Sequence, residues 1–397
     1  MSRYKSYVPE QAYLLPPSVH EELKSNHLCF FIRRMVERLD LSGFEQAYGA
    51  EGGALYAPEL MLSVWLYAYA TGITSARQLE RRLVEDLPLR YLAAGSRVDN
   101  WALSAFRRRH ARALNDCFTR VLEIARELGI GKLGRVAIDS TRIKASACRD
   151  RVDTEQQLRD LRAQLRRQVR RWQQTVDRDE DGGGLEIAIE HLEDKLAELP
   201  QRLEKLRKSG LKKLSATDSD ARFLRCRGGR FELGYTGEIA VSDDHLIVAQ
   251  RVTQNEADNA SLVPMVEQII QRYNSPPEKI LADSGFFSLQ NLKQMEALQL
   301  DAYVPDSNLA RSLNVGVRCH GKAKALTHRR MRRKLRSEQG RKIYAHRKAI
   351  VEPVFGILKQ QRNLRQFRTR GLQTVGCEFT LATLAYNLSR MHAMGVR

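Results

Sequence analysis

The chain has 397 residues, and its 66 lysines and arginines against 47 acidic residues give a formal net charge of +19. This length allows one to three domains with a sizeable core, and the excess of positive charge predicts a polyanionic partner. The six cysteines are scattered without paired spacing, which excludes a disulfide framework or a zinc module and favours a reduced cytosol. There is no signal peptide and no apolar run long enough to cross a bilayer, so we expect no membrane association.

The first third of the chain is predicted to be an irregular arm, residues 1–29, followed by a helical region, residues 30–130. Apolar residues recur there at helical spacing, and one helix is predicted to run from Leu103 to Val121. Basic residues lie opposite its apolar face. A charge run is usually a solvated surface, but the net charge favours phosphate contact by a helix-turn-helix-like unit. The predicted DNA contacts are Arg107, Arg108 and Arg109.

A short apolar run, Val136 to Ile138, is typical of a buried strand and ends at Asp139. A carboxylate at such a place is costly to bury unless it is hydrogen-bonded, paired with a cation or bound to a metal. Taken alone, this pattern favours an aspartate that caps a turn. Arg142 and Lys144 follow directly and are candidate DNA contacts.

Residues 153–213 do not resemble a compact α/β core. Apolar residues recur at threes and fours before and after a glycine turn, which predicts an antiparallel helical hairpin inserted between the first and second core strands. The first arm is rich in arginine and the second in glutamate, so we expect the arms to neutralise each other. Pro200 should kink or interrupt the second arm. A structural or dimer role is favoured over a clamp on DNA, because this periodicity needs no nucleic acid to explain it.

The core is predicted to resume with strands at Glu232–Val241 and His245–Val252, which must lie beside the Asp139 strand. Asp258 precedes a helical pattern and is interpreted as a cap rather than a catalytic acid. A second short apolar run then ends at Asp283. Ligands of open α/β sheets lie outside the carboxyl ends of the strands, so two aspartates on adjacent strand ends would face one shared site.

A third acid, Glu352, lies in a helical pattern beside Pro353. The preceding residues 311–348 are the most basic stretch and are predicted to form a loop that surrounds the site with cations. Three hard oxygen ligands without a soft partner suit magnesium or manganese rather than zinc. Two such ions about 4 Å apart could bridge a scissile phosphate.

These segments resemble the DDE-type transposases of bacterial insertion sequences. The matching residues are Ala137-Ile138-Asp139-Ser140-Thr141, Ala282-Asp283-Ser284-Gly285-Phe286, and the series Tyr344, Arg347, Lys348, Glu352 and Lys359. The gap from Arg347 to Glu352 is one residue longer than in the usual family pattern, and Lys348 restores that spacing.

The resemblance implies an α/β catalytic domain, residues 131–152 and 214–397, with a ribonuclease-H-like mixed five-stranded sheet and helices on both faces. It implies Asp139, Asp283 and Glu352 as catalytic metal ligands for Mg²⁺ or Mn²⁺, with two ions expected. Tyr344, Arg347, Lys348 and Lys359 would contact DNA. Residues 30–130 would bind the transposon ends and contribute to dimerisation.

The resemblance thus predicts an enzyme that cleaves double-stranded DNA at element ends and transfers strands into target DNA. It would act as a homodimer on DNA, in the cytoplasm and associated with the nucleoid. Two alternatives stay open, namely a metal-dependent nuclease of the same fold and a non-catalytic DNA-binding protein derived from a transposase.

Overall fold

The computed structural model describes residues 18–46, 56–176, 183–226, 228–323 and 325–396. Residues 1–17 of the predicted arm and residues 177–182 of the predicted hairpin turn lie outside this part. Helices precede the first strand, as predicted for residues 30–130, but α1 and the start of α2 also lie in the arm that was predicted to be irregular. Their bounds are α1 (Val19–Glu22), α2 (Leu28–Val36), α3 (Ser42–Glu45), α4 (Pro58–Ala70), α5 (Ala76–Glu85), α6 (Leu87–Leu92), α7 (Asn100–Arg109) and α8 (Ala111–Glu127).

The single helix predicted from Leu103 to Val121 is in fact two, because α7 ends and α8 begins at His110. The backbone of His110 has φ −106° and ψ 44°, outside the helical region. Its buried ring packs against Phe44 and Phe106. A tertiary contact, which local periodicity does not register, therefore accompanies the break.

The central sheet has the order β4-β5-β1-β7-β8. Strand β6 also pairs with β5, along the part of β5 that follows its pairing with β4. Its strands are β1 (Arg135–Lys144), β4 (Arg222–Arg225), β5 (Phe231–Ser242), β6 (Ile247–Thr253), β7 (Lys279–Ala282) and β8 (Asp301–Tyr303). Strand β1 runs antiparallel to β5 and parallel to β7, and β7 runs parallel to β8. This mixed sheet confirms the predicted ribonuclease-H-like fold class. The short strand β4 is an addition to the five strands that were predicted.

Helix α11 (Leu262–Tyr273), preceded by the 3-10 turn η1 (Asp258–Ala260), carries the chain from β6 to β7. A second turn, η2 (Ser284–Phe286), and helix α12 (Leu289–Ala297) connect β7 to β8. The predicted strand pair therefore lies beside β1, and the predicted crossover helix leads to the Asp283 strand. These connections place the segments that follow β1, β6 and β7 at one edge of the sheet, because all three strands run in the same direction.

The predicted loop over residues 311–348 is wrong, because most of it is helical. After α13 (Ser307–Val315), helix α14 (Leu326–Arg336) leads into α15 (Glu338–Gly356) and the π-helix η3 (Ile357–Gln361). Leu335 of α14 is fully buried, and Arg332 is buried in an ion pair with Asp306. Lys334 also pairs with Asp301, so two of the basic residues that were predicted to surround the site form ion pairs within the protein instead.

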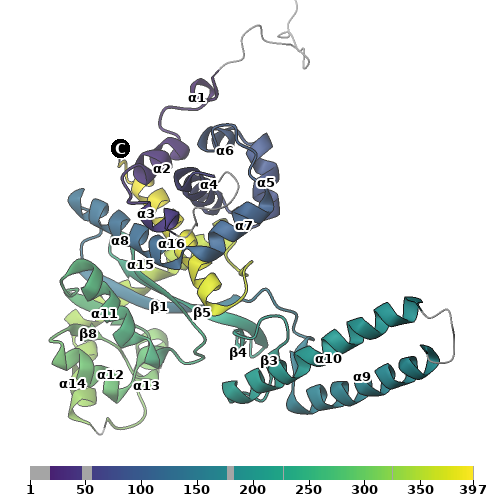
Figure 1. The fold of residues 1–397 in the computed structure, drawn as a ribbon. Coiled ribbons are helices and arrows are strands. Elements are labelled where there is room, and N and C mark those ends of the chain that lie inside the picture. The colour runs from purple at the N-terminus through teal and green to yellow at the C-terminus, as the bar shows by residue number, and fades with distance from the viewer. Residues whose placement is uncertain (1–17, 47–55, 177–182, 227, 324, 397) are drawn as a thin grey trace, which may run out of the picture.

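The insertion is a helical hairpin of α9 (Glu155–Val176) and α10 (Gly183–Ser209). A two-stranded sheet, β2 (Val152–Asp153) and β3 (Leu214–Ser215), closes its base. Figure 1 shows the hairpin extending away from the central sheet beyond β3 and β4. Helix α10 runs through Pro200 without interruption. The hairpin has a small apolar core of its own, formed by residues such as Leu158, Leu165 and Leu192.

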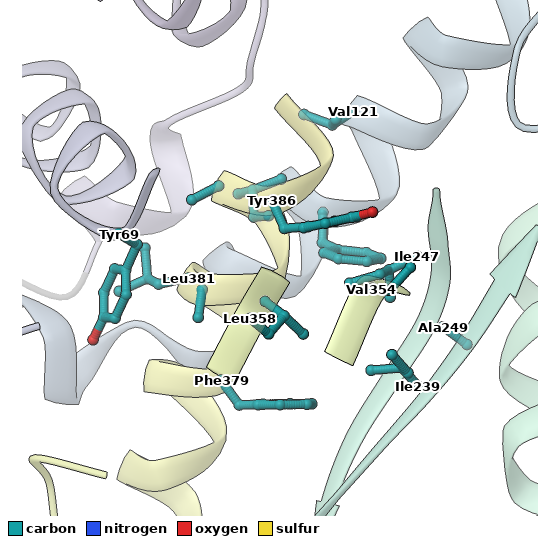
Figure 2. Close-up of a cluster of buried hydrophobic side chains, with 14 of the residues drawn as sticks. Tyr69, Val121, Ile239, Ile247, Ala249, Val354, Leu358, Phe379, Leu381 and Tyr386 are labelled. Carbon is teal, nitrogen blue, oxygen red and sulfur yellow. The ribbon is translucent and has the colours of Figure 1, made fainter. Parts of the chain in front are cut away.

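The carboxyl-terminal helix α16 (Leu372–Ala393) lies between the amino-terminal helices and the sheet, where it contacts α4, α7, α8 and β6. Figure 2 shows this junction, with side chains from α4, α8, β5, β6, α15, η3 and α16 in one cluster, including Tyr69, Val121, Ile239, Ile247, Val354, Leu358, Phe379 and Tyr386. The predicted domain boundary near residue 130 therefore falls inside a shared hydrophobic core. No described helix combines the length and apolar character needed to cross a bilayer.

Candidate active site

Sheet register brings the first two predicted acids level with each other. Ile138 of β1 pairs with Ala282 of the parallel strand β7. Asp139 and Asp283, each the next residue, therefore emerge side by side at the same edge of the sheet. The apolar residues before them are fully buried, which fixes both strands. Asp283 directly follows the last residue of β7, whereas β1 continues past Asp139 to Lys144 because it stays paired with β5, so the predicted strand end at Asp139 is wrong.

The carboxylate of Asp139 is held in a confined, charged environment. Arg347 of α15 donates a hydrogen bond from Nη1 to Asp139 Oδ2 over 3.1 Å, and the Asp139 side chain is 19% exposed. The pKa of Asp139 is raised from 3.8 to about 6, mainly by burial and in addition by the nearby Asp283, against the opposing effect of Arg347. The structure therefore places two like charges together with one cation beside them.

Two members of the predicted basic and aromatic series also lie at this site. Arg347 and Tyr344 are buried on the inner face of α15, and both interact with Asp139 and Asp283. Burial raises the pKa of Tyr344, which keeps its hydroxyl protonated. Lys348 is exposed. Of the two adjacent basic residues, Arg347 is thus the one that contacts Asp139.

Glu352 lies elsewhere on the same helix. It is exposed, and it stands about 140° around the helix axis from Arg347 at 3.6 residues per turn. Within the described residues, no three His, Cys, Asp or Glu side chains are placed so that they could hold a metal ion. The structure therefore brings Asp139 and Asp283 together but does not complete a three-carboxylate cluster with Glu352.

A fourth carboxylate, Asp258, lies beside the site. Ser140 donates its hydroxyl hydrogen to Asp258 Oδ1 over 2.7 Å, and Arg142 pairs with the same oxygen over 3.2 Å. A Cβ atom on Gly285 would lie 2.9 Å from Asp258 Oδ2 and 3.0 Å from Asp283 Oδ1, so a larger residue there would displace these carboxylates.

The interpretation of Asp258 as a helix cap was therefore wrong. Neither η1 nor α11 has a side-chain cap, and the Asp258 carboxylate instead joins the loop after β6 to β1. A signal was available in the topology, since the segment after β6 emerges at the same edge of the sheet as Asp139 and Asp283.

The predicted DNA contacts near β1 have different surroundings. The guanidinium of Arg142 also donates to Thr236 Oγ1 over 2.9 Å and to the Glu256 carbonyl, so it braces the protein itself. Lys144 is more open and pairs with Glu232 over 3.0 Å. Lys359, in η3, donates from Nζ to the Arg142 carbonyl over 3.1 Å. Together with Arg365 these cations line a pocket of about 210 Å³ at the end of β1.

The prediction that Arg107 contacts DNA needs correction. Arg107 is 4% exposed, lies over the Trp65 ring and pairs with the fully buried Glu378 over 3.8 Å. An enclosed, paired guanidinium cannot reach a phosphate. Arg108 and Arg109 are exposed on the same helix and stay predicted DNA contacts.

Comparison with known families decides the class of protein. A family model described as "Transposase DDE domain" matches residues 211–388, and one described as "Transposase domain (DUF772)" matches residues 17–109. The chain belongs to the DDE transposases. This transposase is thus an enzyme of divalent-metal-dependent DNA phosphoryl transfer, acting in transposition of an insertion sequence. No curated protein and no solved structure matched the chain.

The DDE match covers only part of the site, and the second match lies outside it. Asp283 and Glu352 lie within the matched DDE segment, whereas Asp139 and the hairpin lie between the two matched segments. The assignment of Asp139 therefore depends on its register with Asp283.

The donors present suit a hard divalent cation. Asp139 and Asp283 offer carboxylate oxygens, the ligands that magnesium and manganese prefer. Burial and the neighbouring Asp283 disfavour the ionised form of Asp139, an effect that a bound cation would offset. The transposase thus has two suitable ligands level with each other, one within β1 and one directly after β7.

Proposed function

We propose that Asp139 and Asp283 are the catalytic carboxylates of this transposase and that Glu352 is the third. The β1–β7 register, which sets both aspartates level at one sheet edge, is the observation that carries this proposal. Glu352 is supported by its place within the matched DDE segment and on α15, the helix whose Arg347 contacts Asp139. Magnesium or manganese, as two ions, would be the metal.

Each side chain of the site has a task in this scheme. Asp139 and Asp283 would hold the cations, which supply activation of water and stabilisation of the leaving 3′ oxygen. Arg347 keeps Asp139 oriented, and its pairing favours the ionised form of that carboxylate. Lys144, Lys359 and Arg365, around the pocket at the end of β1, would neutralise the phosphates of the bound strand. The 3′ hydroxyl released by cleavage would then attack target DNA at the same site.

Asp283→Asn is the direct test, assayed with magnesium on a duplex that carries the insertion-sequence end. We expect cleavage to fall by at least about a hundredfold, because a metal ligand is lost. The matched control is Asp243→Asn, which removes a carboxylate that pairs with Arg135 at the opposite end of β1. Control activity should stay near wild type. Wild-type cleavage by Asp283→Asn would exclude this site, and the same assay on Glu352→Gln decides the third ligand separately.

We also propose that the transposase acts as a homodimer on DNA. A chain with one site must act on two element ends, which two copies would satisfy. Sedimentation of the protein with end DNA should give a complex of two chains, and a complex of one chain would contradict the proposal.

A further inference from the structure

Helix α9 presents a row of arginines that have no acidic partner among the residues that the structure describes. The side chains of Arg162, Arg166, Arg167, Arg170 and Arg171 are all exposed. Within the described residues, none of these five forms an ion pair, whereas Arg159 at the base of the same helix pairs with Glu155 over 2.6 Å. The row is therefore a concentrated positive surface on one arm of the hairpin.

The expectation that the second arm neutralises this row was wrong. The acids of α10 with described side chains, namely Glu190, Glu193, Asp194, Glu198 and Glu204, are exposed and form no ion pair with α9. Apolar side chains such as Leu165 and Leu192 occupy the space between the arms. The ion pairs that do connect the hairpin lie at its base, where Arg202 meets Asp153 and Arg207 meets Glu155. Charges on the outer part of each arm therefore face solvent.

The spacing of the row fits a nucleic-acid backbone. Arg162, Arg166 and Arg170 are four residues apart, so they lie on one face and span about 12 Å along the helix. That distance corresponds to roughly three or four phosphates at about 3.4 Å per phosphate along one strand. The guanidinium fork binds phosphate in a bidentate manner. Like charges at this spacing repel one another, and a bound polyanion would relieve that repulsion.

We propose that the outward face of α9 binds the sugar–phosphate backbone of duplex DNA that extends beyond the active site. The hairpin directly follows β1, whose end forms part of the cation-lined pocket, and projects away from the sheet (Figure 1). The inference rests on the proposed function only for the position of the active site. Contact with phosphates would add affinity without reading sequence.

A second copy of the chain is the other partner that charge would allow, with its acidic α10 against the α9 row. Exposed ion pairs of this kind contribute little to binding, because solvent screens them. Lys195, Lys205 and Lys208 also interrupt the acidic arm. DNA is therefore the better match to a row that carries one sign of charge.

The test compares two variants of the full chain that lose the same charge. One carries Arg162→Gln, Arg166→Gln and Arg170→Gln on α9, and the control carries Lys195→Gln, Lys205→Gln and Lys208→Gln on α10. Affinity is measured against salt for a long and a short mixed-sequence duplex. We expect the α9 variant to bind the long duplex about tenfold more weakly, with the slope of log affinity against log salt reduced by roughly 2 to 3. Binding of the short duplex, and both affinities of the control, should stay near wild type.

An unchanged salt slope on the long duplex would overturn the proposal. If the slope is unchanged and sedimentation shows that the α9 variant no longer self-associates, the row binds a second copy instead. Circular dichroism and a melting curve establish that the variant is folded. Failure of the active-site proposal has a separate signature, namely normal cleavage by Asp283→Asn.

Discussion

In the proposed active site, the charge that would serve function at Asp139 opposes the stability of the fold. Its carboxylate lies beside Asp283 in a largely buried position, and a single guanidinium, that of Arg347, offsets part of the repulsion. A group whose ionised form is disfavoured in the folded protein lowers the free energy of unfolding at neutral pH. Without metal, the charge on Asp139 lowers the stability of the fold. With metal, the same carboxylate would be a ligand.

Asp139→Asn should therefore stabilise the metal-free transposase. A pKa of about 6 in place of 3.8 corresponds to at most roughly 3 kcal/mol at neutral pH, since one pKa unit is about 1.4 kcal/mol. Loss of the Arg347 partner offsets part of this, so we expect a gain of about 1–2 kcal/mol by urea unfolding in a chelator. Added manganese should raise the melting temperature of wild type but not of the variant. A less stable variant in chelator would contradict the prediction.

At the scale of elements, α13 and α14 are joined to the sheet edge through one carboxylate. Asp306 follows β8, caps α13 by accepting hydrogen bonds from the backbone N–H groups of Asn308 and Leu309, and pairs with Arg332 over 2.7 Å. His328 contacts the same carboxylate over 2.8 Å. Although burial opposes ionisation, the hydrogen bonds from Arg332 and His328 hold the pKa of Asp306 well below its usual value.

This network predicts a pH-dependent loss of stability. A carboxyl whose pKa is lowered in the folded state stabilises the fold above its unfolded pKa of 3.8 and loses that contribution as the pH falls below it. Asp306→Asn, which can still cap α13, should cost about 2–4 kcal/mol at pH 7. Between about pH 5 and pH 2 the difference in free energy of unfolding between variant and wild type should shrink, because the Asp306 carboxyl becomes protonated in the unfolded wild-type chain while it is still ionised in the folded one. A constant difference across this range would show that Asp306 does not act through its charge.

At the scale of the whole molecule, the buried pair of Arg107 and Glu378 ties the amino-terminal helices to α16. Glu378 is fully buried and also accepts hydrogen bonds from the backbone of Arg368 and Thr369. Because α16 contacts both the helical region and β6, loss of this pair should destabilise the whole shared core.

Arg107→Leu should lower the free energy of unfolding by about 3–5 kcal/mol, because Glu378 would be left buried without its cation. Unfolding should still occur in one transition, since the core is continuous. The matched control is the double variant Arg108→Gln and Arg109→Gln on the exposed side of the same helix, which should weaken DNA binding while leaving the melting temperature nearly unchanged. The reverse pattern, with Arg107→Leu stable and deficient only in DNA binding, would restore the original prediction for Arg107.

Much of the fold follows from local patterns in the sequence. Apolar runs that end in aspartate predicted the strands β1 and β7, and recurrence at threes and fours predicted the hairpin and most helices. These patterns record which residues avoid water, which is a property of the residue and its near neighbours. The resemblance to DDE transposases added the topology, so the placement of Asp139 beside Asp283 could be expected before any coordinates.

The tertiary structure alone decided the partner of each charge. The sequence shows Arg107 as one of three adjacent arginines, yet its partner, Glu378, arrives from the last helix of the chain. Contacts with distant segments likewise determine the roles of Asp258, Arg142 and Arg332. The α9 arginines have no such contacts within the described residues, which leaves them open to a partner. Periodicity determines which face of an element is buried, whereas an ion pair depends on where two separate elements meet, so only the assembled fold distinguishes an arginine that braces the protein from one that is open to DNA.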